Sequence, residues 1–313
     1  MTHPKNAISI IGIKKTYKAS GKTEPKMALK GFDLNIPTGS TFALLGPNGA
    51  GKSTLINILA GLVDKTDGTV EIWGMDIDKQ PRNSKCAIGI VPQELNVDPF
   101  FSPAKLLDLH AGLYGVPKEM RKTEEILRSV GLWDKRNAYT RHMSGGMRRR
   151  LLIAKAMVHN PPILVLDEPT AGVDIELRQQ LWDNIRTLNK QGTTIVLTTH
   201  YLEEAEEICD YIAVINDGEL VANDTKDLLL KGMDKKRVIL TLNTPFDLKH
   251  AQKDIETKIL DTKRVSFTFA PSKKSIGDVL EAITKHNYAI QDIVTEDANL
   301  EDLFLKLTSK NNS

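Results

Sequence analysis

A glycine-rich segment, GPNGAGKST at residues 46–54, has the spacing of a polyphosphate-binding loop. Its glycines let the backbone turn tightly and aim N–H groups at an anion, and the helix expected after it adds a positive end. Lys52 brings a full charge to the terminal phosphates, and Ser53 offers a hydroxyl to Mg²⁺. The residues that we predict to form this phosphate site are Gly46, Pro47, Asn48, Gly49, Ala50, Gly51, Lys52, Ser53 and Thr54.

Two consecutive acids follow an apolar run in ILVLDEPT, residues 163–170. Ligand sites of open α/β sheets lie at the carboxyl ends of the strands, where these acids would stand. Asp167 can serve Mg²⁺ directly or through water, and Glu168 can orient and polarise a water against a γ-phosphate. An acidic loop after a core strand is common, so this interpretation depends on the phosphate loop elsewhere in the chain.

Three single residues fit the same site. Gln93, after the run IGIVP, could reach the metal or the attacking water, and His200, at the end of TIVLTTH, could donate a hydrogen bond to the γ-phosphate. Tyr17 is a candidate to stack on adenine. Each also has an ordinary interpretation, as a solvated glutamine, a structural histidine or a packing aromatic. Each therefore gains weight only from the motifs around it.

The stretch MSGGMRRR, residues 143–150, places a serine and two glycines before three arginines. On a helix three neighbours fan over about 200°, so the arginines cannot form one stripe along a nucleic-acid backbone. No aromatic residues are interleaved to stack on bases. A serine N-cap followed by glycines instead offers a hydroxyl and open N–H groups at a positive helix end. Ser144, Gly145 and Gly146 therefore predict a second anion site, although one triphosphate seldom needs two such sites from one chain.

These segments need a scaffold that brings strand ends together. Short apolar runs alternate with helical patterns, which predicts a mainly parallel sheet covered on both faces. The strands are predicted at 42–46, 88–92, 163–167, 194–200 and 211–215. Runs before residue 37 resemble added antiparallel strands, and mostly helical patterns at about 94–160 predict an inserted helical subdomain. We therefore expect an α/β domain over residues 1–231.

The pattern changes near residue 232, where the charged, turn-prone run KGMDKKR begins, which we interpret as a linker. Strand patterns in RVILTLN, RVSFTFA and YAIQDIV and helical patterns in SIGDVLEAITKHN and NLEDLFLKLTSK follow. We predict a small α+β accessory domain over residues 232–313, and its composition indicates no ligand site.

The composition is that of an ordinary soluble protein. The 313 residues carry a formal net charge of +2, too small to imply a polyanionic partner. The two cysteines, Cys86 and Cys209, lack metal-ligand spacing, which favours a reducing compartment. No run approaches the ~18 to 20 apolar residues that cross a bilayer. A membrane function would therefore need another chain to supply the span.

In their order along the chain, GPNGAGKST, Gln93, MSGGM, ILVLDEP, AGVD and His200 resemble the motifs of the ATP-binding-cassette (ABC) ATPases, over about residues 8–230. The MSGGM signature is the discriminating segment, because many proteins with a phosphate loop lack it. The resemblance implies a P-loop cassette fold, ATP and Mg²⁺ as ligands, and Tyr17 as the adenine-stacking aromatic. It adds Asp174, in the segment AGVD, to the nucleotide site. The metal-binding residues implied are Ser53, Gln93 and Asp167.

In this family two domains dimerise head to tail, and each ATP lies between the phosphate loop of one domain and the signature of the other. The resemblance therefore implies that Ser144, Gly145 and Gly146 contact nucleotide held by a second copy of the chain, with Glu168, His200 and Gln93 acting in hydrolysis. The arginines at 148–150 would mostly pair with acids or face solvent. Met143 and Met147 depart from the common LSGGQ form. The first is a volume-conserving swap, whereas the second removes a polar side chain.

The run SGGM with basic residues after it, the segment TTHYLEEAE and the C-terminal NLEDLFLKLT resemble the ABC-2-type exporter branch, which includes daunorubicin-resistance-type ATPases. That branch implies an ATPase subunit at the cytoplasmic face of a bacterial-type inner membrane, driving a separate permease and binding no nucleic acid. The alternative is a soluble ABC ATPase that acts on ribosomes or DNA. Such proteins usually carry two cassettes or long coiled coils, whereas this chain has one phosphate loop, one signature and no long heptad array. A P-loop kinase or GTPase would lack the signature.

Overall fold

The structure, a computed structural model, describes residues 3–18, 24–170, 175–252 and 254–309. The chain forms two compact units, Met1–Thr225 and Lys226–Ser313. The division falls before helix α8 (Lys226–Lys231), whereas the sequence pattern placed it after residue 231. The reason is that α8 contacts α10 (Leu300–Ser309) of the second unit.

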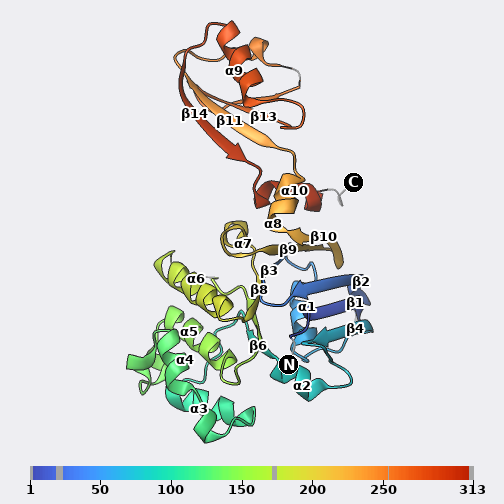
Figure 1. The fold of residues 1–313 in the computed structure, drawn as a ribbon, viewed down its shortest axis with the longest axis vertical. Helices are drawn as coiled ribbons and strands as arrows, with labels where there is room; N and C mark the ends of the chain where they lie inside the picture. Colours follow the sequence, from blue (N-terminus) through green and yellow to red (C-terminus); the bar gives the residue numbers. More distant parts are fainter. Residues whose placement is uncertain (1–2, 19–23, 171–174, 253, 310–313) are drawn as a thin grey trace. The chain divides into compact units, whose positions relative to one another are not determined.

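The first unit begins with a four-stranded antiparallel sheet in the order β2-β1-β4-β5 (Figure 1). Its strands are β1 (Asn6–Tyr17), β2 (Lys26–Pro37), β4 (Asp67–Ile72) and β5 (Met75–Asp76). Ile8, Ile10 and Ile13 of β1 are buried, and they join the same hydrophobic core as the phosphate-loop helix. This sheet contains the antiparallel strands predicted before residue 37.

A six-stranded sheet in the order β10-β9-β3-β8-β7-β6 forms the centre of the first unit (Figure 1). All neighbouring strands in it are parallel except β10, which pairs antiparallel with β9. Strands β3 and β8 are buried along their whole length, as expected for strands covered on both faces. The strands are β3 (Thr41–Leu45), β6 (Ile88–Val91), β7 (Ile163–Asp167), β8 (Thr194–Thr198), β9 (Tyr211–Asn216) and β10 (Glu219–Thr225).

Four helices accompany these sheets: α1 (Lys52–Leu59), α2 (Pro81–Cys86), α6 (Ile175–Lys190) and α7 (Leu202–Ile208). Helix α1 directly follows β3 through the phosphate loop, and α7 follows β8. The parallel strands therefore end at one edge, where the loops that carry the predicted chemistry emerge.

The segment between β6 and β7 is the predicted helical insertion (Figure 1). It contains α3 (Pro103–Leu113), α4 (Thr123–Ser129) and α5 (Gly145–Ala156), with short 3₁₀ turns at Lys118–Met120, Trp133–Lys135 and Thr140–His142. Leu107, Leu127 and Leu151 are fully buried within it. Helix α5 contacts α3 and α4 as well as strand β6, so it joins the insertion to the central sheet.

The second unit is a four-stranded antiparallel sheet in the order β12-β13-β11-β14 with helix α9 packed on its core. Ser275 and Asp278 form a capping box at the start of α9. The elements are β11 (Lys236–Leu242), a 3₁₀ turn (Leu248–His250), β12 (Glu256–Ile259), β13 (Arg264–Phe269), α9 (Ile276–Lys285) and β14 (Ile290–Asp297), between α8 and α10. The predicted α/β cassette with a small α+β unit is thereby confirmed, although β12 and α8 were not predicted.

Among the described residues, no helix combines the length and the apolar character needed to cross a membrane.

Candidate nucleotide-binding and hydrolysis site

The phosphate loop needs glycine at two positions for reasons of space. A Cβ atom at Gly46 would lie 2.2 Å from the carbonyl oxygen of Ile215, and one at Gly51 would lie 2.7 Å from that of Ala28. Gly51 also has a positive φ of 113°. No side-chain cap hydrogen bond is present at the start of α1 among the described residues, so its leading N–H groups remain available to an anion.

Lys52 begins α1 with its side chain folded over this loop. Its ammonium donates hydrogen bonds to the carbonyl oxygens of Gly46 (2.6 Å) and Pro47 (3.1 Å). Burial lowers the pKa of Lys52, whereas the negative charges of Glu168 and Asp167 oppose that shift. The buried cation and the two acids therefore share one electrostatic environment. Ser53, the next residue, is exposed.

The acid pair stands at the end of β7, where one neighbouring hydroxyl orients both residues. Thr198, at the end of β8, donates from Oγ1 to Asp167 Oδ1 (2.5 Å). The same Oγ1 and the carbonyl oxygen of Thr198 accept from the N–H of Glu168, each at 3.1 Å. These bonds hold Glu168 at φ 45°, a left-handed conformation that non-glycine residues seldom adopt. Thr198 was not predicted as a site residue, although its place beside the acids follows from strand order.

Gln93 and His200 converge on the carboxylate of Glu168. Gln93 Nε2 donates to Glu168 Oε2 at 2.8 Å, and His200 Nδ1 lies 3.4 Å from Glu168 Oε1. The three residues come from the ends of three parallel strands, β6, β7 and β8. The structure therefore brings together the residues that the sequence proposed for the reacting end of a γ-phosphate.

Tyr17 ends β1 beside the phosphate loop. Its hydroxyl lies 3.4 Å from Thr54 Oγ1, the residue is 40% exposed, and the Lys15 ammonium lies 4.9 Å from the ring centroid. An exposed ring near the loop is compatible with base stacking. Its contact with adenine stays a prediction. Asp174 lies outside the described residues.

The signature segment has the predicted cap. Ser144 precedes α5 in an extended conformation, and its Oγ accepts a hydrogen bond from the N–H of Met147 at 3.3 Å. Ser144 and Gly145 are exposed, whereas Met143 is 5% exposed and packs inward. The turn therefore presents a hydroxyl and free glycine backbone to solvent, anchored by a buried methionine.

The prediction for the three arginines was wrong. Among the described residues none of the three pairs with an acid, and each donates to a backbone carbonyl: Arg148 to Arg141 and Arg150 to Val130, both at 3.2 Å. Arg149 is 4% exposed, and its Nη1 donates to the carbonyl oxygens of Pro92 (3.1 Å) and Gln93 (3.0 Å). Sequence spacing gave their directions around the helix but not the depth at which α5 packs against the loop after β6.

A buried carboxylate that the sequence did not single out links two of these loops. Glu204 of α7 is 2% exposed. It accepts from Thr170 Oγ1 (2.5 Å), just after the acid pair, and from Thr199 Oγ1 (2.9 Å), just before His200. Arg178 Nε lies 3.5 Å from it. Glu204 therefore holds the loops after β7 and β8 together.

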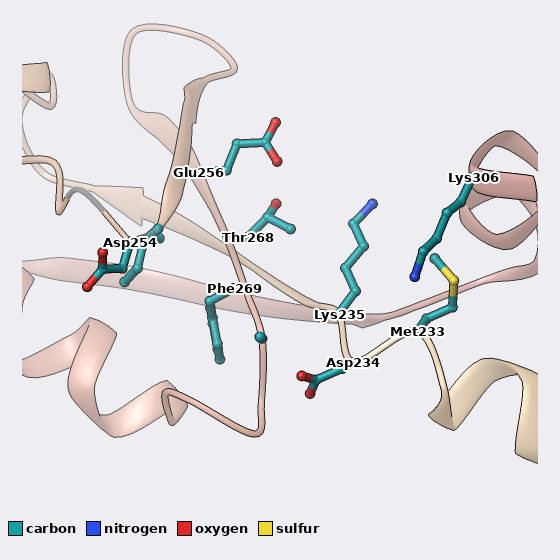
Figure 2. A pocket seen from close by; sticks show the side chains of 10 residues that line it. Met233, Asp234, Lys235, Asp254, Glu256, Thr268, Phe269 and Lys306 are labelled. Atoms are coloured by element: carbon teal, nitrogen blue, oxygen red, sulfur yellow. The ribbon is translucent and has the colours of Figure 1, made fainter. Parts of the chain in front are cut away.

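The second unit has a separate hollow of about 570 Å³. Figure 2 shows Lys235, Lys306 and Met233 toward one end and Asp254 and Phe269 toward the other, with Glu256 and Thr268 between. Its lining mixes both charges, and none of the predicted site residues lies in it.

Residues 29–171 match the family model for the ABC transporter. The chain is 35% identical to the linearmycin resistance ATP-binding protein LnrL of Bacillus subtilis (strain 168), over 94% of this chain and 96% of that protein. It is 32% identical to the daunorubicin/doxorubicin resistance ATP-binding protein DrrA of Streptomyces peucetius, over 98% and 94%. It is also 32% identical to a Nod factor export ATP-binding protein I of Cupriavidus pinatubonensis (strain JMP 134 / LMG 1197), over 96% and 91%.

Solved structures give the same result. One, described as the dimeric, post-hydrolysis state of the ATP-binding cassette MJ0796 bound to ADP and Pi, is 30% identical with a TM-score of 0.63. It covers 70% of this chain and 98% of its own. Another, the ATP-binding subunit of an ABC transporter, is 26% identical with a TM-score of 0.64, over 72% and 93%. Together with the clustered Glu168, Gln93 and His200, these matches show that the chain belongs to the ABC transporter family, as an ATPase subunit of its exporter branch.

Proposed function

We propose that two copies of this chain close head to tail around two ATP–Mg²⁺ complexes and that hydrolysis drives a separate membrane permease. The observation that carries the hydrolytic part is the convergence of Gln93 and His200 on Glu168, within the electrostatic reach of Lys52. The names of the relatives support the transport part, since they describe resistance and export proteins.

ATP would be held at the start of α1. Backbone N–H groups of the loop at residues 46–54 would surround the phosphates, and Lys52 would exchange its two carbonyl partners for phosphate oxygens. Such an exchange replaces neutral acceptors by charged ones, which strengthens the hydrogen bonds. Tyr17 would cover the adenine at the exposed end of β1.

Magnesium fits the donors that the structure offers. The Ser53 hydroxyl is exposed, Asp167 is fixed by Thr198, and Gln93 carries an amide oxygen. Mg²⁺ prefers such hard oxygen ligands and completes its shell with phosphate and water. Within the described residues no cluster of three His, Cys, Asp or Glu side chains could hold a metal by itself, which suits an ion bound together with its nucleotide. Bound Mg²⁺ would neutralise charge on the β- and γ-phosphates.

Glu168 would take the proton of the attacking water. In the structure its two carboxylate oxygens are engaged by Gln93 and His200. Gln93 must therefore turn away for Glu168 to reach a water in line with the γ-phosphate, while His200 donates to that phosphate. Thr198 keeps Glu168 and Asp167 in register during this change.

The signature turn would complete the site of the other copy. Ser144, Gly145 and Gly146 present a hydroxyl and N–H groups at the exposed, positive end of α5, which suits a γ-phosphate bound on the partner. Asp174 remains a proposed residue of the nucleotide site. The permease would place the chain at the cytoplasmic face of the membrane.

A trapped dimer tests the shared site. The full chain with Glu168→Gln should be monomeric with ADP and dimeric with Mg²⁺ and ATP, measured by size-exclusion chromatography with light scattering. A Glu168→Gln, Ser144→Arg variant should bind ATP and stay monomeric. A chain that binds ATP and remains monomeric, alone and with its membrane partner, would contradict the shared-site proposal. Co-purification from membranes would identify the permease.

A further inference from the structure

The signature helix α5 is tied to the loop after β6 by one buried cation. Arg149 lies five positions after the N-cap Ser144 and is 4% exposed. Its Nη1 donates to two carbonyl oxygens, those of Pro92 (3.1 Å) and Gln93 (3.0 Å). Among the described residues, Arg149 forms no ion pair with a carboxylate.

Burying Arg149 in this way carries an unfavourable free energy for folding. Burying a charged side chain costs several kcal/mol unless its partners compensate. Neutral carbonyls compensate only in part, and the buried Nε has no hydrogen-bond partner in the described structure. Burial accordingly lowers the pKa of Arg149, and the charges of Asp167 and Glu168 oppose the shift. A methionine or leucine would fill the space without this cost, so packing alone does not explain an arginine here.

The two carbonyls stand on either side of one α-carbon. They belong to the peptide groups before and after Gln93, so holding both fixes the planes that set the direction of its side chain. That side chain donates to Glu168 Oε2 at 2.8 Å. A continuous path therefore runs from Ser144 through α5 and Arg149 to Gln93 and the catalytic glutamate.

We propose that Arg149 is a positioning residue that couples the signature turn to Gln93, so that docking of Ser144 on one nucleotide sets the hydrolytic geometry at the other. When α5 moves on closure, Arg149 carries the Gln93 backbone with it and changes the hold of Gln93 on Glu168. The inference rests on the proposed function, because it needs Ser144 to contact nucleotide on a second copy.

Steady-state kinetics of the full chain test this coupling. Arg149→Met keeps the length of the side chain and removes its donors, and we expect kcat to fall on the order of tenfold with little change in the KM for ATP. Arg149→Lys keeps the charge but lacks the planar guanidinium, so its kcat should lie between those of the wild type and Arg149→Met. The matched control is Arg148→Met, from the same tract, whose partner is the carbonyl of Arg141 and not a peptide group beside Gln93, and it should retain wild-type kcat.

A double-mutant cycle with Gln93→Ala separates coupling from a merely structural role. If Arg149 acts through Gln93, adding Arg149→Met to Gln93→Ala should change kcat by less than twofold, since interacting residues are non-additive. Losses that multiply, or wild-type kcat for Arg149→Met, would overturn the inference. If Arg149→Met lowers the thermal midpoint sharply, the same cycle with Arg149→Lys decides.

The two proposals fail differently. If Glu168→Gln and Gln93→Ala both leave kcat unchanged, the assigned hydrolytic roles are wrong and the coupling falls with them. If both lower kcat while Arg149→Met and Arg149→Lys do not, only the coupling is wrong.

Discussion

Two helix starts among the described residues, those of α1 and α5, are the proposed anion sites, and they differ in what surrounds them. Helix α1 begins with a buried lysine that shares its environment with Asp167 and Glu168. Helix α5 begins with an exposed serine and glycines that have no such neighbours among the described residues. The start of α1 therefore has groups that could bind an anion and groups that could act in hydrolysis. The start of α5 has only groups that could bind an anion, as expected for a site completed by a second chain.

The glycines of the two starts show the same difference. At Gly46 an added Cβ would meet the carbonyl oxygen of Ile215 at 2.2 Å, because the loop packs on its own chain. At Gly145 an added Cβ would meet only Leu95 Cδ1, at 3.9 Å. The first glycine is required by this fold, whereas the second leaves room for something outside it.

The largest expected effect on kcat comes from Glu168, one of the acids near the start of α1. Glu168→Gln should lower kcat by about 10²- to 10⁴-fold, because a general base is lost. The affinity for ATP should change little, since the phosphate loop is untouched. Single-turnover hydrolysis and equilibrium binding of a fluorescent ATP analogue measure the two effects. Unchanged turnover would show that Glu168 is not the general base. The difference between the starts of α1 and α5, one beside catalytic acids and one not, would then lose its basis.

Mixing two inactive chains tests whether the second start serves another molecule. Ser144→Ala and Lys52→Ala should each abolish most turnover. A mixed dimer joins an intact phosphate loop to an intact signature at one of its two sites, so equal mixing should restore about a quarter of the wild-type intact sites if pairing is random. Single-turnover hydrolysis of the mixture measures this. Activity equal to the average of the two variants would mean that each start serves its own chain.

Gly46→Ala and Gly145→Ala sharpen the steric contrast. The first should destabilise the cassette by about 1–3 kcal/mol, because the overlap forces the loop to shift. The second should change the free energy of unfolding by less than about 0.5 kcal/mol, as an open surface position does. Urea unfolding of the unliganded chain measures both. Equal destabilisation by the two changes would show that the signature turn is packed within its own chain.

The smallest expected effect is a pH dependence from the buried lysine. Burial lowers the pKa of Lys52 below its unfolded value of 10.5, so between the two values the unfolded chain binds more protons. The free energy of unfolding should therefore rise with pH in that alkaline window, and less so in Lys52→Met. Denaturant unfolding at several alkaline pH values, compared between the two chains, measures the slope. Identical slopes would indicate that the ammonium is solvated in the folded state.

Sequence patterns were sufficient for the parts of the site that lie next to a strand end. The glycine spacing, the acid pair after an apolar run and the serine before α5 each have a local physical reason. Gln93 and His200 could be proposed because parallel strands end at one edge. Arg149 and Glu204 could not, because their roles depend on how deeply α5 and α7 pack against loops distant in sequence. The assignment of α8 to the second unit could not be predicted for the same reason, because it depends on the contact of α8 with α10.

Glu168 stands on a backbone conformation that suits glycine, held there by its neighbour Thr198. The backbone conformation therefore gives no preference for a glutamate at this position. Substitutions at residue 168 should abolish turnover while the protein still accumulates, intact and able to hold nucleotide. A cell that expresses such a variant together with the wild-type chain would assemble mixed dimers of one active and one inactive subunit. The loss of transport would therefore be dominant.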